Sequence, residues 1–287
     1  MNYIIFDLEW NNAYNYASKK GINEIVEVGA VKFDENLNFI DSFRQYVSPV
    51  LSRKLSKHFV KLSDVTLGEL KEKGRPFKEV ITDFANWCGD CSKNVFLSWS
   101  NSDLYVLADN YKRNFSTADV FFMKKYADVQ KYCQYFIDGI SDNNQISLTD
   151  CSDYFDIDYD DEMHHHALFD CELASACLKK VFDEKVFKMF VHKCDCNYFD
   201  KLLFKDYYIA APVTKDFNIY KTELKCPCCS SKMKRIKDYD FLNNTFKSVA
   251  ICNGCGKKFW VNVRAKKVYD GVKVSVRINN ISKKRNK

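Results

Sequence analysis

The chain has 287 residues, of which 46% are hydrophobic and 15% aromatic, and its formal net charge at pH 7 is +6. This length and apolar content exclude a disordered chain and support one large domain with a smaller one. Because the sequence has neither a secretory signal pattern nor an apolar run long enough to span a bilayer, we expect a soluble, cytoplasmic protein with no membrane partner.

The first part of the chain reads as strands followed by alternating strands and helices. Residues 3–10, 25–33 and 39–47 are predicted strands, and the turn "DENLN" joins the last two. Apolar residues at helical spacing in residues 76–91 and 102–113 predict helices on either side of a buried strand, "KNVFLSW". This order predicts an α/β domain at residues 1–186, with a mixed sheet flanked by helices.

The rest of the chain divides into a connecting segment, residues 187–222, and a small antiparallel β domain, residues 223–287. From Lys221 onward there are 18 Lys and Arg against 4 Asp and Glu, a net charge of +14, while residues 1–220 carry a net charge of −8. A basic end can bind a polyanion, and an acidic body requires divalent cations to do so. The alternative is a solvated basic tail with no partner.

Two acids stand on the first predicted strand. Side chains alternate along a strand, so Asp7 and Glu9 point to one face, and a pair of carboxylates favours hard divalent cations such as Mg²⁺ or Mn²⁺. Two further segments carry acids with neighbouring polar groups: "SNSDLYVL" contains Asp103, and "HHHALFDCELASACLKKVF" contains Asp170. An exposed edge strand with two solvated acids is the alternative for Asp7 and Glu9 alone.

The order Asp-x-Glu, Asp, His-x-x-x-x-Asp resembles the DEDD superfamily of 3′-5′ exonucleases, which includes the proofreading exonucleases and RNase T. By matching positions, Asp7 and Glu9 belong to the first motif, Asp103 to the second, and His165 with Asp170 to the third. The histidine five residues before the final Asp places the resemblance in the DEDDh branch. It covers residues 1–185 and implies a ribonuclease H-like fold.

The resemblance implies that the four carboxylates bind two Mg²⁺ or Mn²⁺ ions and that His165 is the general base. Two such ions, about 3.5–4 Å apart, can activate a water and stabilise the leaving 3′ oxygen. A histidine suits the base because its pKa of about 6.5 lies near neutral pH. We expect His165 on a loop at the mouth of the site and Asp170 in a helix that faces the metals. His164 and His166 are alternatives for the base, and a zinc site formed by the three adjacent histidines is a further alternative.

The resemblance also places Trp10 and Asn11 in the pocket for the terminal nucleotide, where an aromatic ring can stack on any base. Because Trp10 shares the Leu8 face of the strand, packing in the core is an equal alternative.

Two C-x-x-C pairs lie 22 residues apart, Cys226 with Cys229 and Cys252 with Cys255. Each pair can offer two thiolates to one tetrahedral Zn²⁺, so they predict a structural zinc ribbon, with Cys228 as an alternative ligand. Thirteen cysteines, an odd number in a chain of this length, favour reduced thiols over disulfides.

Basic and aromatic residues alternate next to the second pair. Lys257, Lys258, Phe259 and Trp260 form the mixture that follows a phosphate backbone and stacks bases, whereas a protein-binding or purely structural ribbon is the alternative.

These observations predict a two-metal 3′-5′ exonuclease that releases nucleoside 5′-monophosphates from single-stranded nucleic acid, with RNA favoured. A DNA-processing or proofreading exonuclease of the same mechanism and a non-catalytic nucleic-acid-binding module are the alternatives.

Overall fold

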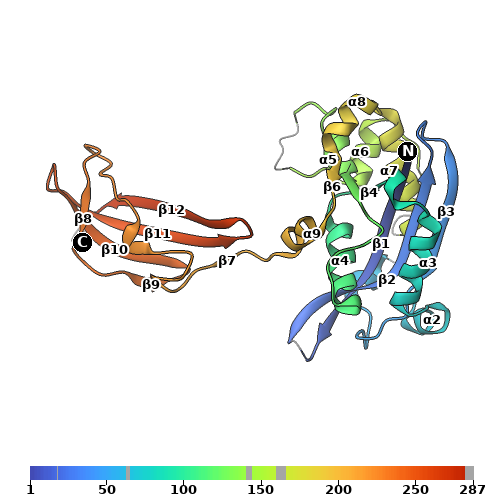
Figure 1. The fold of residues 1–287 in the computed structure, drawn as a ribbon, viewed down its shortest axis with the longest axis horizontal. Coiled ribbons are helices and arrows are strands. Elements are labelled where there is room, and N and C mark those ends of the chain that lie inside the picture. The colour runs from blue at the N-terminus through green and yellow to red at the C-terminus, as the bar shows by residue number, and fades with distance from the viewer. Residues whose placement is uncertain (18, 63–64, 140–143, 160–165, 282–287) are drawn as a thin grey trace. The chain divides into compact units, whose positions relative to one another are not determined.

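The computed structural model describes residues 1–281 apart from residues 18, 63–64, 140–143 and 160–165. The chain divides into two compact units, Met1–Leu203 and Phe204–Lys287 (Figure 1). The segment that we expected to be a connector, residues 187–222, is divided between them. Within the described residues, no helix is both long enough and apolar enough to cross a membrane.

A mixed sheet forms the centre of the first unit, in the strand order β3-β2-β1-β4-β5-β6. Its strands are β1 (Asn2–Asn15), β2 (Lys20–Phe33), β3 (Phe39–Tyr46), β4 (Asn94–Ser98), β5 (Lys125–Asp128) and β6 (His192–Lys193). β1, β4 and β5 run parallel to one another. β2 pairs antiparallel with β1, β3 with β2, and β6 with β5. The predicted mixed sheet is confirmed.

Helices cover both faces of this sheet (Figure 1). They are α1 (Lys57–Leu62), α2 (Leu67–Lys73), α3 (Phe77–Cys88), α4 (Ser102–Phe115), α5 (Val129–Gln134), α6 (Leu148–Tyr154), α7 (Ala167–Lys180), α8 (Glu184–Phe187) and α9 (Cys196–Leu203), with 3-10 turns η1 (Cys91–Lys93) and η3 (Lys188–Phe190). On one face, Ile4 and Phe6 of β1 pack with α3 and α4. On the other, Tyr3 and Ile5 pack with α5, α6 and α7. Alternation along β1 therefore supplies both cores.

The β1–β2 hairpin is longer than the sequence predicts. Its pairing runs from Tyr3 opposite Phe33 to Asn15 opposite Lys20, with a bulge next to Glu9. On its other side, β1 pairs with β4 only over Asn2–Ile5. Beyond Ile5 that edge of β1 has no strand partner among the described residues, so Asp7 and the residues after it border an open edge.

The second unit is an antiparallel sheet in the order β12-β11-β10-β8, with β7 beside β11 and β9 beside β10. Its elements are β7 (Tyr207–Tyr208), η4 (Ile219–Lys221), β8 (Met233–Arg235), β9 (Asp240–Leu242), β10 (Thr245–Cys252), β11 (Lys258–Val268) and β12 (Gly271–Asn280). A small core of its own includes Ile219, Phe246 and Val261. The predicted small antiparallel β domain is confirmed, and it begins before residue 223.

Candidate active site

Asp7, Glu9 and Asp170 converge on one point. An oxygen from each carboxylate lies within 4.8 Å of the other two. Asp7 and Glu9 come from alternate positions on β1, and Asp170 from the first turn of α7. The strand alternation read from the sequence and the helical position of Asp170 both agree with this geometry.

Asp103 is placed by the turn between β4 and α4. The Ser98 and Tyr126 hydroxyls both donate to the Ser100 carbonyl, at 2.6 and 2.8 Å, and Ser100 has a positive φ of 72°. This turn puts Asp103 in the first turn of α4, where its buried carboxylate accepts a hydrogen bond from the Leu8 N–H at 3.1 Å. A carboxylate in this position also interacts favourably with the helix dipole.

Gly29 brings α7 close to the sheet. It lies opposite Asp7 in the β1–β2 pairing, and a Cβ at this position would stand 2.5 Å from the Ala167 carbonyl carbon and 2.6 Å from the Leu168 nitrogen. Only glycine allows the helix to approach so closely. Asp170 thereby reaches the two acids of β1.

We expect Gly29→Ala to weaken divalent-metal binding and to destabilise the protein by about 1–3 kcal/mol, the usual cost of overpacking. The added methyl group must push the α7 backbone, and Asp170 with it, away from Asp7. Calorimetric titration with Mn²⁺ and urea unfolding measure the two effects. Gly21→Ala in the same strand, where a Cβ meets nothing within 4 Å, is the control. Unchanged Mn²⁺ affinity in Gly29→Ala would contradict this role.

The four acids line one hollow of about 350 Å³. Its lining comprises Asp7, Leu8, Glu9, Trp10, Phe59, Trp99, Ser100, Ser102, Asp103 and Asp170. Burial and the neighbouring carboxylates, Asp170 first among them, raise the pKa of Glu9 to about 8. Burial raises the pKa of Asp103 to about 7, and burial together with Asp103 and Glu9 raises that of Asp7. An oxygen-only donor set with such repulsion fits a hard divalent cation.

The raised pKa values make the metal-free protein sensitive to pH. A carboxyl group whose pKa is higher in the folded than in the unfolded state favours folding while protonated, and that contribution is lost as the pH rises through the folded pKa. We therefore expect the melting temperature in EDTA to fall between about pH 5 and about pH 8. Saturating Mg²⁺ should reduce this fall, because the bound cation favours the ionised acids. The same pH dependence with and without Mg²⁺ would contradict the cation site.

Sequence analysis missed two charged residues next to the acids. Glu27 lies opposite Glu9 in the hairpin, is 3% exposed, and forms an ion pair with Arg44 at 2.6 Å. Arg44 offsets the charge of this buried carboxylate, which would otherwise repel Glu9. The sequence contained a signal for this arrangement: Glu27 and Gly29 stand two residues apart on a predicted strand, so both face the same side of the sheet.

The proposed base, His165, lies outside the described residues, as does His164. His166 is the N-cap residue of α7, and its buried Nδ1 atom has no hydrogen-bond partner in the part of the chain that the structure describes.

Trp10 and Asn11 have different surroundings. Trp10 packs against the core of the first unit and also lines the hollow with the acids, so its contact with a terminal nucleotide stays a prediction. Asn11 is fully buried: its Nδ2 donates to the Ser52 hydroxyl and the Lys54 carbonyl, and its Oδ1 accepts from the Ser56 N–H. The expected contact of Asn11 with substrate is therefore corrected to a positioning role, because its polar atoms are used in holding a loop.

In the second unit, Cys226, Cys229, Cys252 and Cys255 form one cluster within 4.8 Å. Two Sγ–Sγ distances are 3.7 Å, between Cys226 and Cys255, and 3.4 Å, between Cys229 and Cys252. Thiolates on a tetrahedral Zn²⁺ at about 2.3 Å would stand about 3.8 Å apart, so the cluster suggests a zinc site. The alternative ligand, Cys228, is exposed and is not a member of this cluster.

The local turns explain this convergence. Backbone N–H groups of Gly254 and Cys255 point at the Cys252 sulfur, at 3.3 and 3.4 Å. Hydrogen bonds from the side chain and backbone of Ser231 lower the pKa of Cys229 to about 6, which favours the thiolate that a metal binds. A Cβ at Gly254 would lie 2.5 Å from the Ser231 hydroxyl, so a larger residue there would displace the side chain that hydrogen-bonds Cys229.

Of the residues expected to contact nucleic acid in this unit, some are exposed and one is buried. Lys257, Lys258 and Trp260 are exposed, and Trp260 is 47% exposed. Phe259 is fully buried in the core of the unit, so its predicted stacking role is corrected. Strand alternation along β11 puts it on the opposite face from its two neighbours.

Comparison with known proteins agrees with the architecture of the first unit. The sequence model of the exonuclease family, RNase T, matches residues 4–178. No curated protein sequence matches the chain. Among solved structures, the nuclease domain of 3′hExo, a DEDDh family member, is 21% identical over 62% of this chain and 90% of its own, with a TM-score of 0.53.

Two other structures share the fold. Cell-death related nuclease 4 (CRN-4) is 21% identical over 67% of this chain, with a TM-score of 0.52, and the match spans 65% of the CRN-4 chain. Exonuclease I of E. coli, in complex with a dA16 oligonucleotide, is 12% identical over 88% of this chain and 54% of its own, with a TM-score of 0.51. Since the family model covers residues 4–178 and the acids of the DEDDh motifs line one hollow, the chain belongs to the exonuclease family, in its DEDDh 3′-5′ branch.

Proposed function

We propose that the chain is a two-metal-dependent 3′-5′ exonuclease that releases nucleoside 5′-monophosphates from single-stranded nucleic acid, with RNA favoured. The observation that carries this proposal is the convergence of Asp7, Glu9 and Asp170 in one hollow with Asp103. Exonuclease membership implies dependence on a divalent metal. Two ions, Mg²⁺ or Mn²⁺, fit four carboxylates, and the odd count of thirteen cysteines supports the cytoplasm as the compartment.

Each group has a task in this proposal. The four carboxylates would hold the metals, which supply a nucleophilic hydroxide and charge stabilisation at the scissile phosphate. His165 would accept the proton of the attacking water. Trp10, Phe59 and Trp99 border the same hollow and offer aromatic surface for the terminal base.

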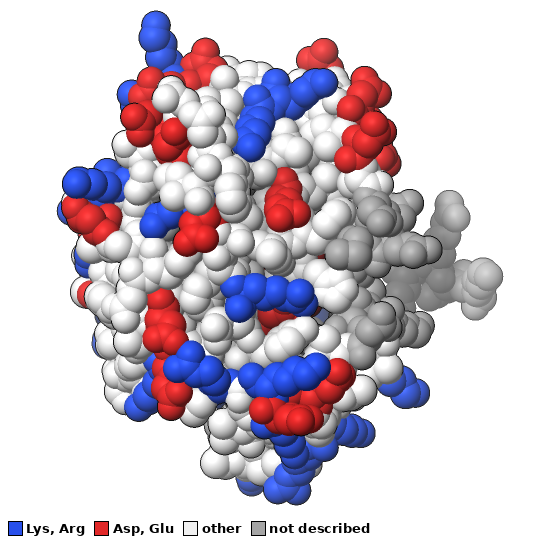
Figure 2. Space-filling model, turned by 90° about the vertical axis from the view of Figure 1, so that its right-hand side faces the viewer, with Lys and Arg blue, Asp and Glu red and all other residues white. Residues whose placement is uncertain are grey.

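The second unit would hold the body of the strand. A polar hollow of about 310 Å³ lies over β10, β11 and β12 and is lined by Asn243, Thr245, Lys247, Asn262, Arg264, Ser275, Arg277 and Asn279. On β11, Lys258 and Trp260 are exposed on the same face as Arg264. In contrast, Lys and Arg are interspersed with Asp and Glu on the face of the first unit that Figure 2 shows. We therefore assign residues 1–203 to catalysis and residues 204–287 to strand binding.

The fold occurs with both kinds of ligand: 3′hExo is bound to rAMP, and exonuclease I is in complex with a dA16 oligonucleotide. The choice between RNA and DNA therefore requires an experiment. Labelled RNA, single-stranded DNA and duplexes of one sequence should be incubated with Mg²⁺ or Mn²⁺. The proposal predicts the fastest shortening for single-stranded RNA. Faster shortening of DNA would favour the DNA-processing alternative, and no shortening of any substrate would favour the non-catalytic binding module.

We expect the double variant Cys226→Ser/Cys229→Ser to lose bound zinc and to unfold the second unit, because so small a core depends on its metal. Hydrolysis of short oligonucleotides should persist, whereas long strands should bind more weakly and with a shallower dependence on salt. Zinc content by mass spectrometry and salt-dependent binding measure these effects. Cys228→Ser, an exposed cysteine outside the cluster, is the control. Unchanged affinity and salt slope in the double variant would assign this unit to protein partners.

A further inference from the structure

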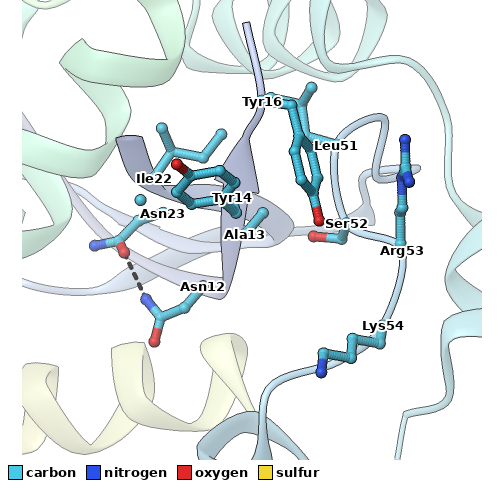
Figure 3. A pocket seen from close by; sticks show the side chains of 11 residues that line it. Asn12, Ala13, Tyr14, Tyr16, Ile22, Asn23, Leu51, Ser52, Arg53 and Lys54 are labelled. Atoms are coloured by element: carbon cyan, nitrogen blue, oxygen red, sulfur yellow. Dashed lines mark hydrogen bonds between the residues drawn. The ribbon is translucent and has the colours of Figure 1, made fainter. Parts of the chain in front are cut away.

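A second hollow of the first unit, of about 410 Å³, lies at the far end of the β1–β2 hairpin. Figure 3 shows its lining, which comprises Asn12, Ala13, Tyr14, Tyr16, Gly21, Ile22, Asn23, Leu51, Ser52, Arg53 and Lys54. None of these residues lines the hollow that contains the four acids.

Two tyrosine rings of this hollow face solvent. Tyr14 is 48% exposed and Tyr16 is 65% exposed, and their ring centroids lie 5.0 Å apart in an edge-to-face arrangement. Exposed aromatic rings are a surface on which unpaired bases stack.

Cations stand beside these rings. Arg53 and Lys54 are exposed, and the Arg53 guanidinium carbon lies 5.0 Å from the centre of the Tyr16 ring. Neither cation forms an ion pair with an acid among the residues that the structure describes. Their positive charge is therefore available to a phosphate backbone.

Buried hydrogen bonds hold the loop that carries the cations. The Glu24 carboxylate, 7% exposed, accepts three backbone N–H bonds from residues 50–52 and one from the Ser52 hydroxyl, at 2.7–2.8 Å. The Asn11 side chain on β1 also forms hydrogen bonds with this loop, at Ser52, Lys54 and Ser56. The cationic loop is thus fixed against the hairpin before any ligand binds, and fixed groups bind at a lower entropic cost.

The hairpin connects the two hollows. β1 carries Glu9 and Trp10 in the first and Asn12 to Tyr14 in the second. A strand rises about 3.4 Å per residue, so Glu9 and Tyr14 are about 17 Å apart along β1. This distance equals about five nucleotides at the 3.4 Å rise of a stacked strand, and fewer in an extended one.

We propose that the outer β1–β2 hairpin and the 51–54 loop form a second binding site in the catalytic unit, which holds the single strand on the 5′ side of the nucleotide being removed. This site rests on the proposed exonuclease activity, and it explains why the hairpin extends beyond the acids. It would make catalysis depend on substrate length without contributing to the chemical step.

The test compares Tyr16→Ala/Arg53→Ala in the full chain with the wild type on a dinucleotide and an octanucleotide. We expect the KM for the octanucleotide to rise about tenfold or more, because stacking and a phosphate contact are lost, with kcat and all dinucleotide kinetics unchanged. The exposed pair Tyr135→Ala/Lys93→Ala, which lines neither hollow, is the control. Equal kinetics of variant and wild type on both lengths, or an equal loss on both, would overturn the proposal.

A binding measurement tests the second site independently of the proposed exonuclease activity. In an Asp7→Asn background with Ca²⁺, the affinity for a fluorescent octanucleotide should fall about tenfold on adding Tyr16→Ala/Arg53→Ala, and the salt slope should become shallower by about 0.7 for the lost cation. Unchanged affinity and slope overturn the second site whether or not the wild type hydrolyses anything. Absence of wild-type hydrolysis with this loss of affinity would instead reject only the exonuclease activity.

Discussion

Asp7→Asn abolishes hydrolysis with either Mg²⁺ or Mn²⁺ in our account, with a loss of about a thousandfold or more. Metal ions supply several kcal/mol of transition-state stabilisation, and each 1.4 kcal/mol corresponds to about a tenfold change in rate. Asp7 lies within 4.8 Å of Glu9 and Asp170, so removal of its charge weakens the site at its centre. The same change relieves repulsion among neighbouring acids, and the metal-free variant should melt at a higher temperature than the wild type.

Two measurements together identify this effect. Hydrolysis rates across a range of Mn²⁺ concentrations report the catalytic loss, and melting in EDTA reports the relief of repulsion. Glu172→Gln removes an exposed acid from the same helix as Asp170 and should change neither quantity substantially. Hydrolysis by Asp7→Asn at the wild-type rate would reject the metal-dependent mechanism, and a lower melting temperature in EDTA would show that the loss of activity reflects unfolding.

His165→Ala should lower the rate about a hundredfold, the range expected when a general base is lost. Because an ordinary histidine pKa is about 6.5, the variant should also lose the rise in rate through that pH range. The neighbours His164→Ala and His166→Ala are the matched controls and should cost less. If His166→Ala proved the most damaging, the third motif would be misaligned by one residue, and the buried Nδ1 of His166 would become the candidate base.

The sequence predicts those parts of the site that depend on the alternation of side chains along a strand. Asp7 and Glu9 share a face because side chains alternate, and this holds in the structure. The same rule, applied to β11, would have separated buried Phe259 from exposed Trp260. The resemblance to DEDDh enzymes added Asp103 and Asp170, whose distance from Asp7 in the sequence gives no local signal.

Other features depend on contacts between distant segments. Asn11 looks like a free polar group in the sequence, but its partners Ser52, Lys54 and Ser56 lie more than 40 residues away. In the outer hairpin, "NNAYN" pairs with "KGINE", and neither segment shows strong apolar alternation. Both strands are therefore extended by their mutual backbone pairing and not by the β propensity of their residues. The second binding site was therefore not predictable from residue pattern alone.

The central claim is stepwise removal of nucleotides from the 3′ end, and a 5′-labelled single-stranded RNA tests it most directly. With Mn²⁺, the account predicts a ladder of labelled strands that shorten one nucleotide at a time, together with nucleoside 5′-monophosphates identified by mass spectrometry. The Asp7→Asn protein, prepared in parallel, should leave the strand intact. Immediate release of the labelled 5′ nucleotide, internal fragments without a ladder, or products that carry a 3′-phosphate would contradict the account.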